Sequence, residues 1–164
     1  MARALTPGDG QDLLARFKQA WERRDPDAAV ALFRGDAEYR FDPFEPPLVG
    51  ANAIRAYWNE AAATQVHVDF DAERVWVAGT TVLASWHAAF TRRVSGERVR
   101  YRGFMTLELD DAGLIGRFRE WSLGRTVGTD RTLKRDDEAA DDRAPADRST
   151  AAQGGGGAGG SDGR

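Results

Sequence analysis

The stretch FDPFEPPLVG, residues 41–50, brings two carboxylates, two phenylalanines and three prolines together in ten residues. Prolines fix φ and remove amide donors, so this stretch is neither the interior of a helix nor a central strand. A merely solvated loop has no need for two aromatic rings. We therefore predict that Phe41 and Phe44 pack over the mouth of a small-molecule pocket, and that the prolines stiffen a loop that presents Asp42.

The carboxylate of Asp42 has two interpretations. At the rim of a pocket, it is placed to abstract a proton from a bound molecule. An Asp that precedes a proline also initiates turns by accepting a hydrogen bond from its own backbone, and that role needs no ligand. Glu45, the second carboxylate of the loop, is interpreted as solvated.

The elements that position these residues are helices first and strands after. Apolar residues recur at helical spacing in residues 9–24 and again in residues 51–63, which predicts two amphipathic helices. A shorter helix is predicted between them, over residues 25–35, with Asp25 as its N-cap and Gly35 closing its end.

From residue 66 onward the hydrophobic period changes to two, which is typical of strands. Glycine-containing links of hairpin length separate the strands, so we expect an antiparallel meander, preceded by a short strand at residues 36–41. Helices followed by a curved sheet make an α+β fold. The meander is predicted over residues 66–79, 81–94, 97–109 and 114–124.

The length of 164 residues suggests a single folded domain, which we place at residues 10–126, after a flexible N-terminus at residues 1–9. No aromatic residue follows Trp121, and residues 130–164 contain one leucine as their only large apolar side chain. Such a composition buries too little surface to offset the entropy of ordering, so residues 127–164 are predicted to be a disordered tail.

Composition excludes several classes of function. The chain has no cysteine and two histidines, and nothing in it favours a metal, flavin or nicotinamide cofactor. The net charge of −3 is spread along the chain, and the five arginines of residues 92–102 are interpreted as the outer face of a hairpin, so nucleic acid is not an expected partner. No apolar run is long enough to span a membrane, and the N-terminus has no secretory core, so we expect a cytoplasmic protein.

Three segments, AWERRDPDAAVALFRGDAEYRF, PLVGANAIRAYW and MTLELDDAGLIGRFREW, resemble the SnoaL-like and ketosteroid-isomerase-like proteins of the nuclear transport factor two-like superfamily. The resemblance covers about residues 10–124. It implies a cone-shaped curved antiparallel sheet covered by three N-terminal helices, and a homodimer formed through the outer face of the sheet. This fold hosts several chemistries, so the resemblance specifies the fold more closely than the reaction.

The resemblance extends to individual residues. Asp42 resembles the proton-abstracting base of ketosteroid isomerase, which also lies in an Asp-Pro pair. Phe17 and Met105 occupy the positions of the two oxyanion donors of that enzyme, and neither side chain can donate a hydrogen bond. Since the loss of one such donor lowers a rate by about 100-fold or more, steroid isomerisation is not expected. Trp58 stands where the isomerase has a supporting tyrosine.

The resemblance also predicts which strand residues face inward, and Arg92 and Glu120 are the conspicuous polar ones among them. Glu120 lies in FREW, which resembles the closing strand of limonene epoxide hydrolase, where an Asp takes part in water activation. Against apolar neighbours its pKa would rise into the range useful for acid–base catalysis. In the alternative interpretation, Glu120 only forms an ion pair with Arg92 or another arginine. The inward-facing residues are Trp86, Ala88, Phe90, Arg92, Tyr101, Gly103, Met105, Phe118, Glu120 and Ser122.

Three functions remain open. The first is an enzyme of the cyclase, isomerase or hydrolase type, with Asp42 or Glu120 as the base and Arg92 steadying a developing anion. The second is a module that binds an apolar or aromatic molecule without converting it. In the third, the protein's own rings plug the cone and the outer sheet face binds another protein. The expected ligand-binding residues are Phe17, Phe41, Phe44, Tyr57, Trp58, Trp86, Phe90, Tyr101, Met105, Phe118 and Ser122.

Overall fold

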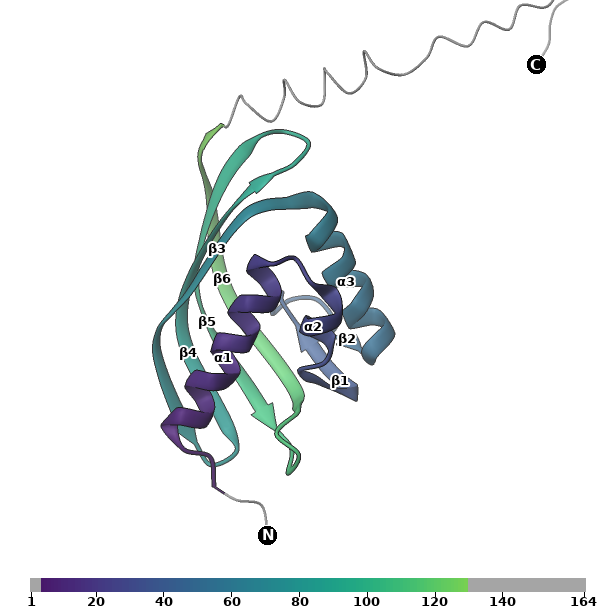
Figure 1. Ribbon diagram of the computed structural model, residues 1–164, viewed down its shortest axis with the longest axis vertical. Helices are drawn as coiled ribbons and strands as arrows, with labels where there is room; N and C mark the ends of the chain where they lie inside the picture. The colour runs from purple at the N-terminus through teal and green to yellow at the C-terminus, as the bar shows by residue number, and fades with distance from the viewer. Residues whose placement is uncertain (1–3, 130–164) are drawn as a thin grey trace, which may run out of the picture.

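The computed structural model describes residues 4–129, and its regular structure confirms the predicted α+β fold, with three helices and six strands in that range. In Figure 1, α1 crosses the concave side of the sheet, and α2 and α3 lie together near β1 and β2. The elements are α1 (Pro7–Glu22), α2 (Pro26–Val30), β1 (Phe33–Arg40), β2 (Leu48–Val49), α3 (Ala51–Thr64), β3 (Gln65–Ala78), β4 (Thr81–Arg92), β5 (Glu97–Leu109) and β6 (Ile115–Thr129).

The six strands form one mixed sheet in the order β2-β1-β6-β5-β4-β3. Strands β3 to β6 pair antiparallel with their sequence neighbours, which is the predicted meander. Strand β1, however, pairs parallel to β6, with Tyr39 opposite Phe118. This pairing joins segments about eighty residues apart, so it brings the proline loop after β1 beside the middle of β6.

Helix α1 begins with a complete capping box. The Asp9 N–H donates to the Thr6 hydroxyl at 3.2 Å, and the Asp9 carboxylate accepts from the Thr6 N–H at 2.7 Å, so each residue satisfies a free group of the other. One face of the helix then turns towards the sheet, as the spacing predicts. Its buried residues are Gly10, Leu13, Leu14, Phe17 and Ala20.

Helix α2 is shorter than predicted. Asp25 is its N-cap, as expected, and accepts from the Ala28 N–H at 3.0 Å. The helix ends at Val30, whereas the prediction extended it to Gly35, and Gly35 lies within β1. Local periodicity did not predict this boundary, because the strand begins where Phe33 pairs with Ile115 of β6, a residue distant in the sequence.

The core is built around Phe17, which is 2% exposed. Its ring lies 5.5 Å from the rings of Trp58 and Phe70 and is stacked on Phe118 at 5.9 Å, so α1, α3, β3 and β6 meet at this residue. Large buried rings of this kind supply most of the hydrophobic stabilisation of a small domain.

Regular structure extends beyond both predicted domain boundaries. Helix α1 begins at Pro7, before the expected start at residue 10, and β6 continues to Thr129, past the expected end at residue 126. The remainder of the predicted disordered tail, residues 130–164, lies outside the described residues. None of the helices within residues 4–129 is long and apolar enough to cross a membrane.

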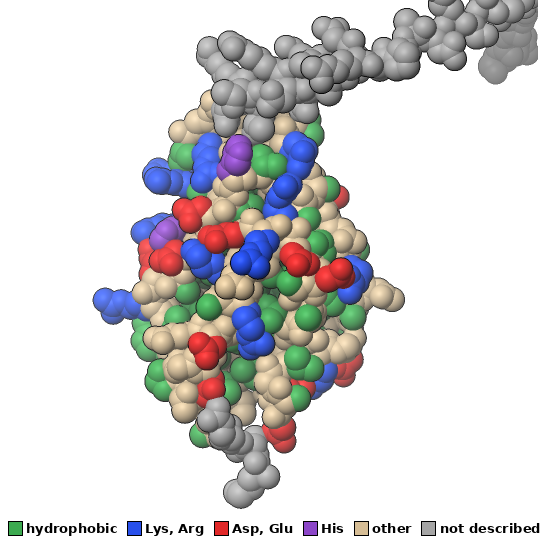
Figure 2. Space-filling view, in the orientation of Figure 1, with side chains coloured by type: hydrophobic (Ala, Val, Ile, Leu, Met, Phe, Trp, Pro, Cys, Tyr) green, Lys and Arg blue, Asp and Glu red, His purple; other side chains and the backbone are tan. Residues whose placement is uncertain are grey.

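Charges on the face that α1 presents are mixed. Figure 2 shows basic and acidic side chains interspersed with apolar ones across this face, without a continuous stripe of one sign. An electrostatic footprint for nucleic acid would require such a stripe.

We expect Phe17→Ala to lower the free energy of unfolding by about 3 to 5 kcal/mol, because the change leaves a cavity where four elements meet. Urea denaturation followed by tryptophan fluorescence measures the loss. Phe44→Ala is the matched control, since Phe44 is 94% exposed and its removal should change the free energy by less than about 0.5 kcal/mol. Equal effects of the two substitutions would contradict the central position of Phe17.

Candidate functional site

Glu120 faces the interior of the cone. Residues two apart on a strand share a face, and Phe118, two positions earlier on β6, is fully buried. Glu120 lies opposite Met105 of β5, whose side chain is also fully buried. The Glu120 side chain therefore points to the concave side of the sheet, as the buried Phe118 side chain does, and as predicted.

Tyr39 and Tyr57 lie near this carboxylate, and Tyr101 lies near Tyr57; we call Tyr39, Tyr57, Tyr101 and Glu120 the tyrosine–glutamate cluster. The rings of Tyr39 on β1 and Tyr57 on α3 are 5.1 Å apart, and both phenol groups interact electrostatically with the Glu120 carboxylate. Tyr101 on β5 interacts electrostatically with Tyr57. Three strands and one helix therefore contribute to a single polar group inside an aromatic surround.

Burial controls the ionisation of this cluster. Desolvation of the carboxyl group raises the pKa of Glu120 from 4.5 to about 8, and a hydrogen bond with Ser122 partly opposes the rise. Burial also raises the pKa of both Tyr39 and Tyr57, and the negative charge of Glu120 raises both further. The interaction between the two hydroxyls raises the pKa of Tyr39 and lowers that of Tyr57, as expected if Tyr39 donates to the Tyr57 oxygen. At neutral pH, Glu120 is therefore predominantly a neutral acid.

Glu120 has no cationic partner. Within residues 4–129, no lysine, arginine or histidine forms an ion pair with it. The predicted inward position of Arg92 is wrong: its side chain is 51% exposed, and its Nε lies 3.8 Å from Glu97. Arg92 is also eight residues along β4 from Ala84, the β4 residue level with Glu120, which corresponds to about 26 Å.

In the proline loop, Asp42 forms a turn. Its Oδ1 accepts from the Phe44 N–H at 2.9 Å, and its carbonyl oxygen accepts from the Glu45 N–H at 3.3 Å. The carboxylate is thus engaged in a local turn, which matches the second interpretation of Asp42. This turn directs Phe44 outward, so its ring is 94% exposed and does not pack against the cluster. Phe41 does stack on Tyr57, at 4.9 Å, and covers the edge of the cluster.

A shallow groove lies beside this loop, along the stretch of β6 that β1 does not reach. It has a volume of about 720 Å³ and is mainly apolar. Ser122, the hydrogen-bond partner of Glu120, is one of its wall residues, so the groove reaches the neighbourhood of the cluster. Its lining residues are Phe41, Asp42, Pro43, Phe44, Arg102, Gly103, Phe104, Trp121, Ser122 and Leu123.

Apart from Phe41 and Phe44 in the proline loop, the predicted ligand-binding residues divide into two groups. Buried side chains with at most 6% exposure have almost no surface facing open space, so they form the core of the cone rather than the wall of an open pocket. They are Phe17, Trp58, Trp86, Phe90, Met105 and Phe118. The half-buried group, Tyr57, Tyr101 and Ser122, surrounds Glu120 at the edge of that core.

Two buried donors in the ring core lack acceptors. The indole N–H groups of Trp58 and Trp86 are buried and form no hydrogen bond within the described residues. By contrast, the indole N–H of Trp21 donates to the Gln65 side chain at 2.8 Å. A buried donor without an acceptor is costly, so the two free indoles mark positions where an oxygen atom would be stabilised.

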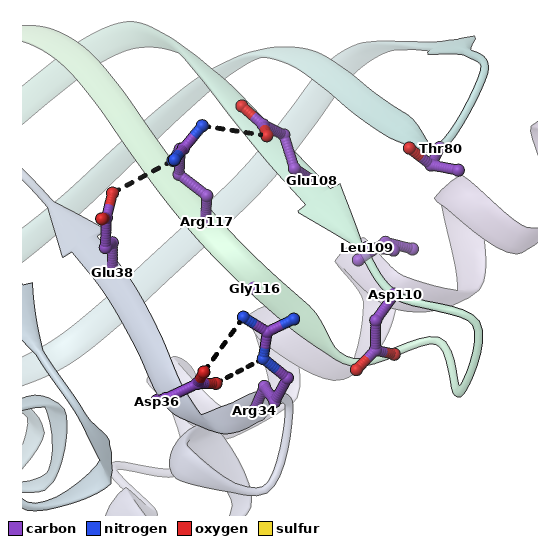
Figure 3. Close-up of a pocket in the computed structure, with 9 residues that line it drawn as sticks. All are labelled: Arg34, Asp36, Glu38, Thr80, Glu108, Leu109, Asp110, Gly116 and Arg117. Carbon is purple, nitrogen blue, oxygen red and sulfur yellow. Dashed lines mark hydrogen bonds and ion pairs between the residues drawn. The ribbon is translucent and has the colours of Figure 1, made fainter.

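A charged hollow of about 370 Å³ on the outer side of the sheet, drawn in Figure 3, has internally paired side chains. Arg117 of β6 donates to Glu38 of β1 at 3.0 Å and to Glu108 of β5 at 3.4 Å. These bonds join three adjacent strands, including the parallel pair, so we interpret the hollow as structural. In the part of the chain that the structure describes, no group of three or more His, Asp or Glu side chains is arranged to hold a metal ion.

Residues 14–118 match the SnoaL-like domain family. The chain belongs to this family. The match spans most of the folded region, from α1 to the inward-facing Phe118 of β6, so the family assignment accounts for the helices and the sheet that build the cluster. No curated protein sequence matches the chain.

Solved structures of the nuclear transport factor two-like fold are similar to the SnoaL-like domain described here. An epoxide hydrolase of Mycobacterium tuberculosis that resembles limonene epoxide hydrolase has 19% identity and a TM-score of 0.61, over 71% of this chain and 84% of that one. SalBIII, an epoxide hydrolase/cyclase-like enzyme of pyran ring formation in salinomycin, has 18% identity and a TM-score of 0.66, over 73% and 97%. A ketosteroid-isomerase-like protein of Catenulispora acidiphila, in complex with trimethylamine, has 15% identity and a TM-score of 0.61, over 67% and 84%. These likenesses establish the fold.

Sequence reasoning did not include Tyr39 among the site residues. Its hydrophobic neighbours indicate a core position, and it is in fact 2% exposed. Its ring stacks on Phe118 at 4.4 Å, and this contact depends on the parallel pairing of β1 with β6. The available signal was the short spacing between Tyr39 and the proline loop, which implies that both lie at the same end of the cone.

Protonation of Glu120 should make stability depend on pH. The carboxyl group of Glu120 keeps its proton up to about pH 8 in the folded protein but releases it near pH 4.5 in the unfolded chain. The free energy of unfolding is therefore unaffected by this group below pH 4.5 and falls as the pH rises from 4.5 towards 8. Glu120→Gln removes this fall. Urea denaturation at about pH 5 and about pH 8.5 should show the variant gaining on the wild type by up to a few kcal/mol at the higher pH, since one pKa unit corresponds to about 1.4 kcal/mol. Glu45→Gln, in the exposed loop, should leave the pH dependence unchanged; parallel curves for wild type and Glu120→Gln would contradict the desolvated acid.

Proposed function

We propose that this SnoaL-like protein is an acid–base catalyst in which Glu120 donates a proton to an oxygen atom of a small apolar molecule. The observation that carries the proposal is the buried carboxyl group without a cationic partner, whose pKa of about 8 keeps it protonated at neutral pH. General acids are most effective when their pKa lies near the working pH. A carboxyl group held only for structure is normally paired or exposed.

The surroundings of Glu120 support catalysis on an oxygen-containing substrate. The Tyr57 hydroxyl, which the Tyr39 hydroxyl approaches, is free to donate towards charge that develops on the substrate. The buried rings behind the cluster provide an apolar surrounding for the carboxyl group. An epoxide or carbonyl oxygen attached to an apolar skeleton fits this combination of donors and rings.

A single carboxylate favours ring closure or isomerisation over hydrolysis. Activation of water at an epoxide needs a base as well as an acid, and Asp42, the other carboxylate proposed from the sequence, is engaged in its own turn. In ring closure by a hydroxyl of the substrate, the nucleophile is already held in place. Its oxygen forms the new C–O bond as the epoxide C–O bond breaks, Glu120 gives its proton to the epoxide oxygen, and the proton of the attacking hydroxyl passes to the resulting Glu120 carboxylate. SalBIII, a structural neighbour, is described as an epoxide hydrolase/cyclase-like enzyme of pyran ring formation, which is consistent with this class.

Access to the cluster requires movement of Phe41. This ring stacks on Tyr57, yet it is 40% exposed and belongs to the loop that borders the apolar groove. We propose that a substrate enters from this groove and displaces the Phe41 ring, so that its oxygen reaches Glu120 past Ser122. The stack of buried rings below then serves as the floor of the site.

The proposal is tested with a panel of small epoxides that carry an internal hydroxyl, with cyclic ether and diol products followed by gas chromatography and mass spectrometry. We expect cyclic ethers from the wild type and a loss of about 100-fold or more in Glu120→Gln, the usual contribution of a general acid. Tyr57→Phe should lower the rate less, and Glu45→Gln should not change it. Binding of panel members with equal affinity to wild type and Glu120→Gln, without any product, would contradict catalysis and favour the binding-module alternative.

A second proposal concerns assembly. On the outer face of the sheet, an apolar outer patch consists of Trp76, Phe104, Trp121 and Leu123. Trp76, Trp121 and Leu123 are 45%, 44% and 86% exposed, and the rings of Trp76 and Phe104 are 6.1 Å apart. Grouped exposed rings of this kind are typical of protein interfaces. We propose that two copies of the chain associate through this patch.

Sedimentation velocity measures this association. The wild type should sediment as a dimer at micromolar concentration, and Trp121→Glu should shift it to a monomer, because a charge would be buried at the centre of the patch. Val94→Glu is the matched control, since Val94 is 85% exposed in the turn between β4 and β5, away from the patch. A monomeric wild type would exclude this interface.

A further inference from the structure

Two arginines face each other across β5 and β6 near the end of the described chain. Arg100 of β5 lies directly opposite Arg125 of β6, and both side chains are exposed on the outer face. Among the described residues 4–129, neither side chain forms an ion pair or hydrogen bond. Like charges placed directly opposite in a sheet repel each other, so this arrangement costs stability unless an anion lies between them.

The space around this pair is a groove of about 620 Å³, which we call the arginine groove. Ala89, a small residue on β4, lies between Asp69 of β3 and Arg100 in the same row of the sheet and leaves the middle of the row open. The groove is lined by Asp69, His87, Ala88, Ala89, Arg100, Tyr101, Arg102, Leu123, Gly124 and Arg125.

The surrounding charges leave the pair uncompensated. Arg102 donates to Glu73 at 2.6 Å, and the His87 ring lies 3.2 Å from the same carboxylate, so Glu73 is already shared. Arg98, the next outward residue along β5, donates to the His67 carbonyl oxygen at 2.5 Å, which leaves its positive charge in place. Asp69 is separated from Arg100 by the width of β4 and forms no ion pair with it. The side of the groove formed by Arg100 and Arg125 is therefore basic, and Arg98 adds a third positive charge just outside it.

A strongly acidic segment of the same chain begins shortly after β6. Residues 136–142, DDEAADD, carry five carboxylates and no basic side chain, and two basic residues, Lys134 and Arg135, precede them. We propose that this acidic segment docks into the arginine groove of its own chain, with its carboxylates between Arg100 and Arg125. Carboxylates pair with guanidinium groups through charge-assisted hydrogen bonds, and arginine presents two parallel donors to each.

The distances allow this contact. Seven residues separate Thr129 from Asp136 and reach at most about 24 Å, whereas Arg125 lies about 13 Å back along β6 from Thr129. Attachment through so short a tether raises the effective concentration of the segment to the millimolar range, so individually weak ion pairs suffice for docking. A comparable pair, Arg40 opposite Arg119, lies about 33 Å from Thr129, so the three carboxylates of residues 136–138 cannot reach it.

Paramagnetic relaxation enhancement on the full chain tests this proposal. The chain has no cysteine, so Ala139→Cys accepts a single nitroxide spin label within the acidic segment. At low salt, we expect the amide signals near Arg100 and Arg125 to lose most of their intensity. At about 0.5 M NaCl the signals should recover, because exposed ion pairs are screened at that ionic strength.

Substitutions separate docking from chance proximity. Arg100→Gln combined with Arg125→Gln should abolish the broadening, and Arg40→Gln combined with Arg119→Gln should leave it unchanged. Broadening that persists in the first double variant, or that is absent at low salt in the labelled chain, would overturn the proposal. In a mixture of spin-labelled unenriched chains and unlabelled nitrogen-15 chains, broadening would show that the segment docks onto a second copy, which would also overturn it.

Discussion

Phe118 and Glu120 share one face of β6, and this geometric constraint determines the chemistry of the protein. A strand alternates its side chains with a period of two, so the face that carries Phe118 into the core must carry Glu120 inward as well. Stacking of Phe118 on Phe17 and on Tyr39 fixes the register from both sides. A shift of the β6 register by one residue would expose Phe118 and bury arginines. Glu120 therefore cannot move into solvent without disrupting the core.

Parity along β6 also explains why the carboxylates near this strand lie in different environments. Glu38 and Glu108 lie on the outer face, where Arg117 bridges them in water-exposed geometry. Glu120 lies three residues after Arg117 on β6 and on the opposite face, where its neighbours are tyrosines and Met105. The outer face therefore carries carboxylates paired with an arginine, whereas burial against aromatic rings raises the pKa of Glu120 on the inner face.

Local sequence periodicity was sufficient to predict the helices and the meander, and the family resemblance predicted the inward direction of Glu120. Local periodicity was insufficient for features that depend on contacts between segments far apart in the sequence. The parallel pairing of β1 with β6 shortens α2 and brings Tyr39 to the cluster, and no local pattern encodes it. The prediction that Arg92 faces inward is wrong for a different reason. Alternation of buried and exposed residues on β4 ends at Ala88, because Ala89, Phe90 and Thr91 are all buried, so an inward position cannot be extrapolated to the end of that strand.

The outer face of the sheet combines two features that act on each other. Leu123 belongs both to the apolar outer patch and to the arginine groove, so a second copy bound at the patch would lie close to Arg100 and Arg125. Two copies meeting face to face would bring four such arginines together, and their repulsion would oppose association. A docked acidic segment on each copy would neutralise these charges before the faces meet. The segment would thus promote assembly through electrostatics alone, and raised salt would weaken the docking while also screening the repulsion that the docking removes.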